Sequence, residues 1–135
     1  MKQENRIPLV LLLLRLSVFL VMFMWTIDKF VRPEHSSKVF ENFYSIKGVG
    51  IVVSYGIGSL EVALLAGFLA GFRKRFTYGA VLLFHAISTV SSFKQYLSPF
   101  EGPNLLFYAA WPMLAACFAL YRLRDLDTLW IVGKK

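Results

Sequence analysis

The stretch IPLVLLLLRLSVFLVMFMWTIDKF, residues Ile7–Phe30, decides the fold of this chain, and Arg15 is its only charged residue before the last turn. About 20 apolar residues are enough for a helix to cross the hydrocarbon core of a bilayer, because each residue adds about 1.5 Å. The chain contains three further blocks of this kind, at Val49–Phe72, Thr77–Tyr96 and Asn104–Tyr121. The sequence therefore predicts an all-α fold, an integral membrane four-helix bundle.

The segments between these blocks are short, so we expect residues 1–135 to form a single membrane domain. Hydrophobic residues make up 57% of the chain, which exceeds the share that is usual in soluble domains. The connection after the first block carries apolar residues at near-helical spacing, namely Val39, Phe40, Phe43, Tyr44 and Ile46. Polar residues occupy the other side, and this pattern predicts a short amphipathic helix at the outer membrane interface between the first two spanning helices.

The formal net charge of +7 is distributed unevenly along the chain. If the N-terminus is cytoplasmic, nine of the 15 basic residues lie in the cytoplasm and five lie outside, and the tightest cluster, Arg73–Arg75, is cytoplasmic. Because lysine and arginine are enriched in cytoplasmic loops, both termini are predicted to be cytoplasmic. As a separate expectation, the protein lies in a bacterial inner (plasma) membrane. The basic excess then reflects topology and contact with anionic membrane lipids, and nucleic acid is not an expected partner.

Arg15, Glu61 and His85 each lie within a different apolar block. An ionisable side chain in hydrocarbon costs roughly 2.5–3.5 kcal/mol, so such residues usually face the bundle interior and pair with one another. Counted from the cytoplasmic end of each block at about 1.5 Å per residue, the three residues lie within roughly 4–5 Å of the same depth. We therefore expect one buried polar site, with an Arg15–Glu61 ion pair and His85 as a third partner.

Polar and aromatic side chains of the last two blocks extend this candidate site. The third block carries one helical stripe made of His85, Ser88, Thr89 and Ser92. Hydroxyl groups in a helix can also bond carbonyls of their own helix, so part of this stripe could be purely structural. In the fourth block, Tyr108 and Trp111 share a face and are candidate walls for a bound ring. Pro112 is expected to kink this helix and to free a carbonyl near Tyr108.

Short motifs surround the three buried polar residues. They are Leu14–Arg15–Leu16, Leu60–Glu61–Val62 followed by Gly71–Phe72–Arg73, a mid-helix His85, and Thr26–Ile27–Asp28–Lys29–Phe30 at the end of the first block. Together they resemble the DoxX family, although many members have glycine where Thr26 stands. The resemblance implies a four-helix membrane bundle whose buried polar residues, here Arg15, Glu61 and His85, share the family's functional role. It also implies a tie to oxidoreduction, since a related subunit accompanies thiosulfate:quinone oxidoreductase and other members are linked to oxidative-stress complexes.

Three functions remain open. In the first, the chain is a membrane subunit in which His85 and Arg15 donate hydrogen bonds to a quinone and Glu61 accepts or relays the proton. No residue here carries electrons, so such a subunit would need a redox protein partner, and no spacing of His, Cys or carboxylate residues suggests a metal site. In the second, the chain is a membrane scaffold or assembly protein whose buried salt bridge is structural. The third, a small transporter, would require a homo-oligomer, because four helices enclose little volume.

Overall fold

The computed structural model describes residues 6–32, 38 and 51–132, and every regular element within them is helical. The longer helices are α1 (Arg6–Val31), α3 (Ile51–Ala70), α4 (Lys74–Ser91) and α6 (Ala110–Arg122). The shorter elements are α5 (Phe93–Leu97) and the 3-10 helices η2 (Asn104–Ala109) and η3 (Arg124–Leu126). The all-α prediction is therefore confirmed for the described residues, whereas the predicted interfacial helix, residues 39–46, lies outside them.

Three helical stretches are long and apolar enough to cross a membrane, at Arg6–Val31, Val53–Ala70 and Asn104–Arg122. Helix α4 differs from them in composition, because it begins with Lys74 and Arg75 and carries several polar residues in its second half. Length and composition thus support a membrane protein with three helices of spanning character. They do not by themselves mark α4 as a fourth.

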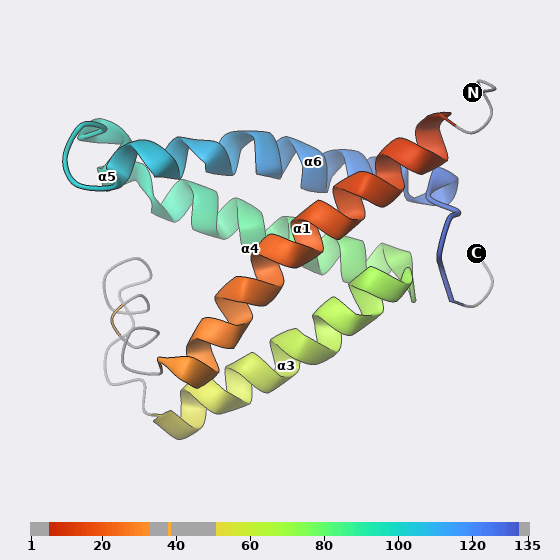
Figure 1. Ribbon diagram of the computed structural model, residues 1–135, viewed down its shortest axis with the longest axis horizontal. Helices are drawn as coiled ribbons and strands as arrows, with labels where there is room; N and C mark the ends of the chain where they lie inside the picture. Colours follow the sequence, from red (N-terminus) through yellow and green to blue (C-terminus); the bar gives the residue numbers. More distant parts are fainter. Residues whose placement is uncertain (1–5, 33–37, 39–50, 133–135) are drawn as a thin grey trace.

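The longer helices pack side by side, and consecutive ones run antiparallel (Figure 1). α1 packs mainly against α3 and α4 mainly against α6, while further contacts join α1 to α6 and α3 to α4. One end of the bundle contains the start of α1, the turn between α3 and α4, and η3, and α5 lies at the opposite end. We call these the basic end and the α5 end, because the first holds Arg6, Arg73, Lys74, Arg75, Arg122 and Arg124.

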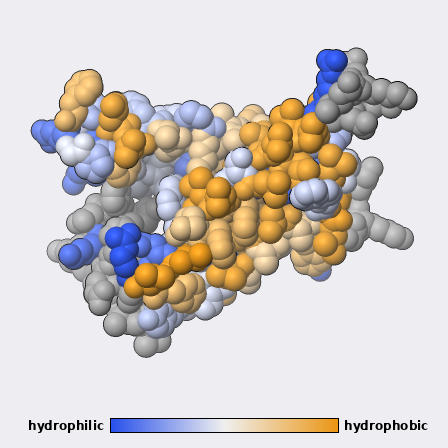
Figure 2. All heavy atoms as spheres, viewed as in Figure 1, coloured by the Kyte–Doolittle hydropathy of each residue, from blue (hydrophilic) through white to orange (hydrophobic). Residues whose placement is uncertain are grey.

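The core of the bundle is apolar and narrow. It consists of Leu11, Val18, Leu65, Phe68, Tyr78, Val81, Cys117 and Leu120. Many other large apolar side chains point outward, among them Leu20, Leu60 and Phe84, and Figure 2 shows a broad apolar surface across the middle of the molecule. An outward-facing apolar surface of this extent suits contact with lipid acyl chains rather than with water.

Gly71 makes the turn that joins α3 to α4. Its φ is +68°, in the left-handed region that glycine adopts without a steric penalty. The N–H groups of Gly71 and Phe72 donate to the carbonyls of Phe68 and Gly67, at 3.1 and 2.8 Å, which is the hydrogen-bond pattern of a Schellman cap. Ile131 packs where a Cβ of Gly71 would lie. The turn therefore also receives the residues that follow α6.

The expected kink at Pro112 takes the form of a helix boundary. The 3-10 helix η2 ends at Ala109 and α6 begins at Ala110, so Pro112 lies in the first turn of α6. Proline is tolerated in a first turn because the backbone N–H that it lacks would have no helical partner there. The fourth predicted block is thus helical throughout, and the helix changes from 3-10 to α type two residues before Pro112.

Candidate functional site

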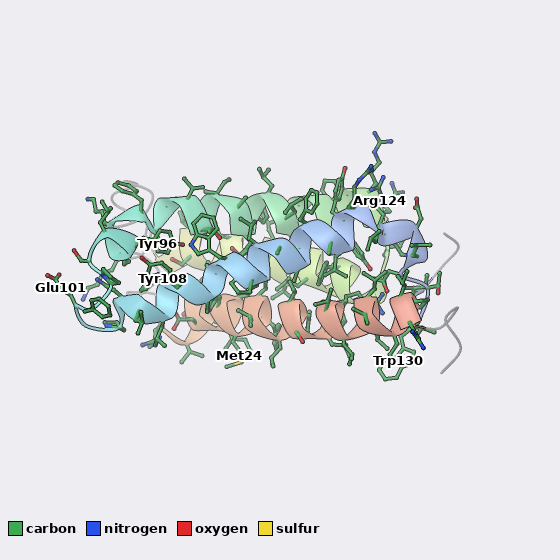
Figure 3. The ribbon with its side chains drawn as sticks, turned by 90° about the horizontal axis from the view of Figure 1, so that it is seen from above. Met24, Tyr96, Glu101, Tyr108, Arg124 and Trp130 are labelled. Carbon is green, nitrogen blue, oxygen red and sulfur yellow. The ribbon has the colours of Figure 1, made fainter. Side chains whose placement is uncertain are left out.

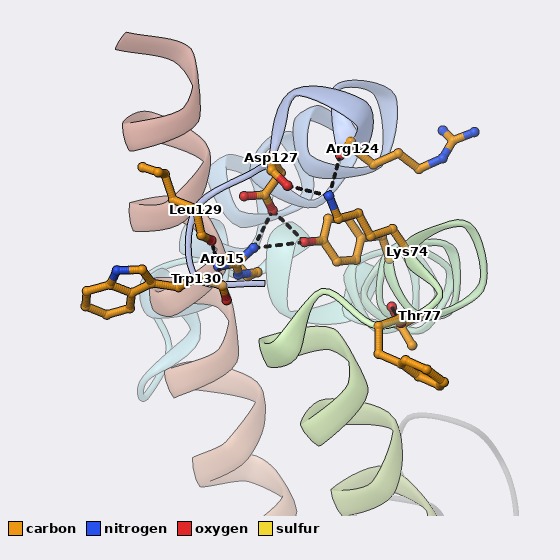
Figure 4. A network of polar contacts seen from close by, with 9 residues as sticks. Arg15, Lys74, Thr77, Arg124, Asp127, Leu129 and Trp130 are labelled. Atoms are coloured by element: carbon orange, nitrogen blue, oxygen red, sulfur yellow. Dashed lines mark hydrogen bonds and ion pairs between the residues drawn. The ribbon is translucent and has the colours of Figure 1, made fainter. Parts of the chain in front are cut away.

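Arg15 is the centre of a buried polar network at the basic end (Figure 4). Its side chain is 0% exposed, and its Nη1 atom forms an ion pair with Asp127 Oδ2 at 2.9 Å. Nη2 donates to the backbone carbonyls of Leu129, at 2.6 Å, and Trp130, at 3.2 Å. A buried charge requires such partners because burial removes its hydration.

Tyr78 and Lys74 of α4 complete this network. The Tyr78 hydroxyl donates to Asp127 Oδ2 at 2.5 Å and accepts from Arg15 Nη1 at 3.3 Å. Lys74 Nζ donates to the carbonyl of Arg124 at 3.1 Å and also to the carbonyl of Asp127. These contacts hold residues 124–132, which we call the C-terminal segment, against α1 and α4 (Figure 4).

The predicted Arg15–Glu61 ion pair is wrong, because the two residues lie at different levels of the bundle. Thr26 Oγ1 lies 2.9 Å from Glu61 Oε2. Glu61 is therefore level with residue 26 of α1, about 11 residues or roughly 16 Å of helix beyond Arg15. The prediction counted depth from the cytoplasmic end of each apolar block, but α1, with 26 residues, is longer than α3, with 20, and extends past it at the basic end.

Glu61 instead forms a second polar cluster with Thr26 and Lys29 of α1. Lys29 Nζ lies 3.0 Å from Glu61 Oε2, and the two side chains are 16% and 28% exposed. Thr26 Oγ1 is 2.9 Å from both Glu61 Oε2 and the carbonyl of Met22. The cluster thus joins α1 to α3, whereas the Arg15 network joins α1 to α4 and to the C-terminal segment.

His85 shares no hydrogen bond or ion pair with either cluster among the described residues, and it contacts α6 and Trp25 of α1. Its Nε2 lies 2.9 Å from the carbonyl of Ala110, and because a carbonyl oxygen only accepts, Nε2 carries the proton. The ring is 1% exposed, stacks on Trp25 with 6.1 Å between ring centroids, and has no hydrogen-bond partner at Nδ1 among the described residues. The three residues expected in one site therefore have three separate sets of polar partners.

The hydroxyl stripe of α4 bonds its own helix. Thr89 Oγ1 donates to the carbonyl of His85 at 2.7 Å, and Ser92 Oγ donates to the carbonyl of Ser88 at 3.0 Å. Such local bonds are the structural alternative that hydroxyl side chains have inside helices. The protons of Thr89 and Ser92 are therefore already used within α4.

Tyr108 and Trp111 lie at the α5 end together with Tyr96. The ring centroid of Tyr96 is 5.3 Å from that of Tyr108 and 5.6 Å from that of Trp111, and the Tyr108 hydroxyl donates to the Tyr96 carbonyl at 2.8 Å. Figure 3 shows Tyr96 and Tyr108 at the end of the bundle opposite to Trp130. The sequence suggests Tyr108 and Trp111 as candidate walls of the buried polar site. In the structure they lie at the α5 end, away from Arg15.

A hollow of about 440 Å³ lies beside Arg15, between α1, α3 and the C-terminal segment. Its lining is mostly apolar and consists of Arg15, Leu16, Ala66, Leu69, Ala70 and Trp130. Arg15 Nε is buried and has no hydrogen-bond partner among the described residues. The hollow is therefore a partly open apolar depression that borders the buried Arg15 side chain.

Sequence reasoning missed three residues of this region, Asp127, Tyr78 and Trp130. Asp127 lies after the last apolar block, in a segment that also contains Asp125, so it reads as solvated. One signal could have indicated Asp127. Glu61 is the one carboxylate in the middle of an apolar block, so Arg15 has few acidic partners available within the blocks. A buried arginine with so few acidic candidates should direct attention to carboxylates outside the blocks.

Comparison of the chain with protein-family models, with curated proteins and with solved structures finds no match. Among the described residues, no three His, Cys, Asp or Glu side chains are grouped so that they could hold a metal ion. The chemistry available at the Arg15 site is therefore that of a guanidinium, a phenol, a carboxylate and apolar walls.

Proposed function

We propose that the chain is an integral membrane protein that binds the head of a lipophilic molecule, a quinone in the first place, in the hollow beside Arg15. The hollow carries this proposal, because it combines apolar walls with a buried guanidinium whose Nε has no partner. Because Arg15 is 0% exposed, a quinone carbonyl oxygen would accept a hydrogen bond from that atom only after the guanidinium turned toward the hollow, and the isoprenoid chain would then run out among lipid chains. Trp130 would contact the face of the ring.

A role beside a membrane oxidoreductase follows from this ligand and from the resemblance to the DoxX family. The residues that line the hollow hold no redox group. Electrons would therefore have to come from a partner protein in the same membrane. The chain would then be a non-electron-carrying subunit of a redox complex.

The proposed topology has four spans, with α4 as the additional crossing and both termini in the cytoplasm. The packing of α4 alongside α3 and α6 supports a crossing by α4, because its neighbours are themselves of spanning length. The gathering of Arg6, Arg73, Arg75 and Arg122 at the basic end supports a cytoplasmic location for that end. A bacterial inner membrane is the corresponding location.

A scaffold or assembly protein is the second candidate function. It is favoured by the contacts of Arg15, whose Nη atoms are already bound to Asp127, Tyr78 and two carbonyls. In that case the network would serve to fix the C-terminal segment, and the hollow would hold only lipid chains.

Binding of decylubiquinone to the purified protein in nanodiscs separates these two functions. We expect saturable binding near one molecule per chain, weakened at least tenfold by Ala66→Leu, because the added carbons fill the hollow. Ala115→Leu is the matched control, since Ala115 is exposed on α6 and lines no part of the hollow. Equal binding by wild type and Ala66→Leu, or no saturable binding at all, would leave the scaffold as the better function.

A further inference from the structure

The ion pair between Arg15 and Asp127 is incomplete. It joins one nitrogen, Nη1, to one oxygen, Oδ2. Arg15 Nε and Asp127 Oδ1 are both buried and have no hydrogen-bond partner among the described residues. Buried polar atoms are usually satisfied, and a guanidinium matches an oxyanion best through two parallel N–H···O bonds. The Asp127 carboxylate therefore lies at the guanidinium of Arg15 but uses only part of its capacity to donate hydrogen bonds to an oxyanion.

Beyond η3, the segment that carries Asp127 is attached to the bundle by the Arg15 ion pair and by hydrogen bonds rather than by a packed helix. It forms no helix up to residue 132, and its backbone contact with α3 is the bond from the Val132 N–H to the Ala70 carbonyl, at 2.7 Å. Trp130 has a φ of +54°, a left-handed conformation that is strained for a bulky residue. Its side chain is 75% exposed while it borders the hollow.

We propose that Asp127 is an internal competitor at this site, and that residues 127–132 form a displaceable latch that an amphiphile with an oxyanion head group can replace. The charge of the ligand follows from Arg15. If Asp127 left and a neutral molecule took its place, the guanidinium would stay buried without a counter-charge, which is strongly unfavourable. A carboxylate or phosphate restores the charge and can bond Nε and a Nη atom together, with the Tyr78 hydroxyl as a further donor.

The hollow supplies the place for the apolar part of the same ligand. It begins at Arg15 and is walled by Leu16, Ala66, Leu69 and Ala70, so a chain attached to the head group would lie between α1 and α3. This inference uses the hollow of the proposed function but does not depend on quinone as its ligand. A quinone would bind with the latch in place, whereas the oxyanion requires its release.

A reversible lock on the latch tests the inference. Because residues 70 and 132 are backbone neighbours, the variant Ala70→Cys with Val132→Cys, in a Cys117→Ala background, can be closed by oxidation and opened by reductant. In nanodiscs, we expect palmitate to bind the reduced form at least tenfold more tightly than the oxidised form. Hexadecanol, which has no charge, should show no such difference. Equal palmitate affinity in the oxidised and reduced forms would contradict the latch proposal, and this conclusion does not depend on whether decylubiquinone binds to the same samples.

Removing the competitor provides the second measurement. Asp127→Asn should bind palmitate at least tenfold more tightly than wild type, and the matched variant Asp125→Asn, on the exposed side of the same segment, should bind like wild type. Competition with palmitate by hexadecyl phosphate and by inorganic phosphate distinguishes the source of the head group. If hexadecyl phosphate alone competes, the anion is carried by a lipid. If inorganic phosphate competes as well, the site also accepts a free anion. Unchanged or weaker palmitate binding by folded Asp127→Asn would show that Asp127 does not compete. If that variant does not fold, the comparison of oxidised and reduced forms decides alone.

Discussion

The two polar clusters of this bundle differ in burial and in the sequence distance between their members. Arg15 and Asp127 are each 0% exposed and come from opposite ends of the described chain. Lys29 and Glu61 are 16% and 28% exposed and come from neighbouring helices. Breaking one partner of a fully buried pair costs several kilocalories per mole, whereas a more exposed pair contributes little. The fold should therefore depend much more on the Arg15 network than on the Glu61 cluster.

The difference also shows where a buried charge can find a partner. Arg15 lies near the basic end, where the chain can return after its last long helix, and the C-terminal segment brings Asp127 back to it. Glu61 lies midway along α3, and its partner Lys29 has a long side chain that can extend along the helix surface. Position along the span thus decides whether the partner comes from a neighbouring long helix or from the segment that follows the last long helix.

The largest effect expected from this comparison is that of Arg15→Met. The substitution leaves the Asp127 carboxylate buried without its counter-charge, so the free energy of unfolding should fall by about 3–5 kcal/mol. The double variant Arg15→Met with Asp127→Asn should recover part of that loss. Denaturant unfolding in a mild detergent, with helix content followed by circular dichroism, measures both values.

Arg75→Met is the control for this pair, because Arg75 is exposed at the same end of the bundle. Its unfolding free energy should stay within about 0.5 kcal/mol of wild type. If the losses from Arg15→Met and Asp127→Asn simply added, the two residues would not be coupled and the comparison between the clusters would fail.

A smaller effect is expected at Glu61. Glu61→Gln keeps an oxygen that can accept from Thr26 and Lys29, so the loss of unfolding free energy should be about 1 kcal/mol or less. In double-mutant cycles, Glu61→Gln should show a coupling energy with Lys29→Met and none with Arg15→Met, because residues without shared contacts behave additively. A measurable coupling energy between Glu61 and Arg15 would support the Arg15–Glu61 ion pair that was predicted from the sequence.

Much of the fold could be predicted because apolar runs and caps are local features. The first helix was expected at Ile7–Phe30 and is observed at Arg6–Val31. The second was expected to reach Phe72, but it ends at Ala70, because Gly71 takes the left-handed conformation that closes the helix. Both differences are within the range in which a helix end depends on cap geometry rather than on hydropathy.

Of the polar network around Arg15, only the burial of Arg15 itself could be predicted from the sequence. Burial of Arg15 follows from the apolar run around it, but its partners depend on how far α1 is displaced along α3, which hydropathy does not report. The return of the C-terminal segment was equally hidden, because Asp127 and Tyr78 have ordinary surroundings in the sequence. A pattern can therefore show that a charge is buried without showing which charge it meets.

The smallest effect is expected at His85, which belongs to neither cluster. His85→Gln keeps an N–H donor that can reach the carbonyl of Ala110, so the cost should be about 1 kcal/mol, mostly from the lost stacking on Trp25. Since the imidazole has no contact with Arg15 among the described residues, decylubiquinone and palmitate should bind this variant with wild-type affinity. Matched titrations of wild type and His85→Gln in nanodiscs provide the measurement. Loss of either ligand in a well-folded His85→Gln protein would mean that His85 and the hollow act together, and the polar groups would then have to be treated as one extended site.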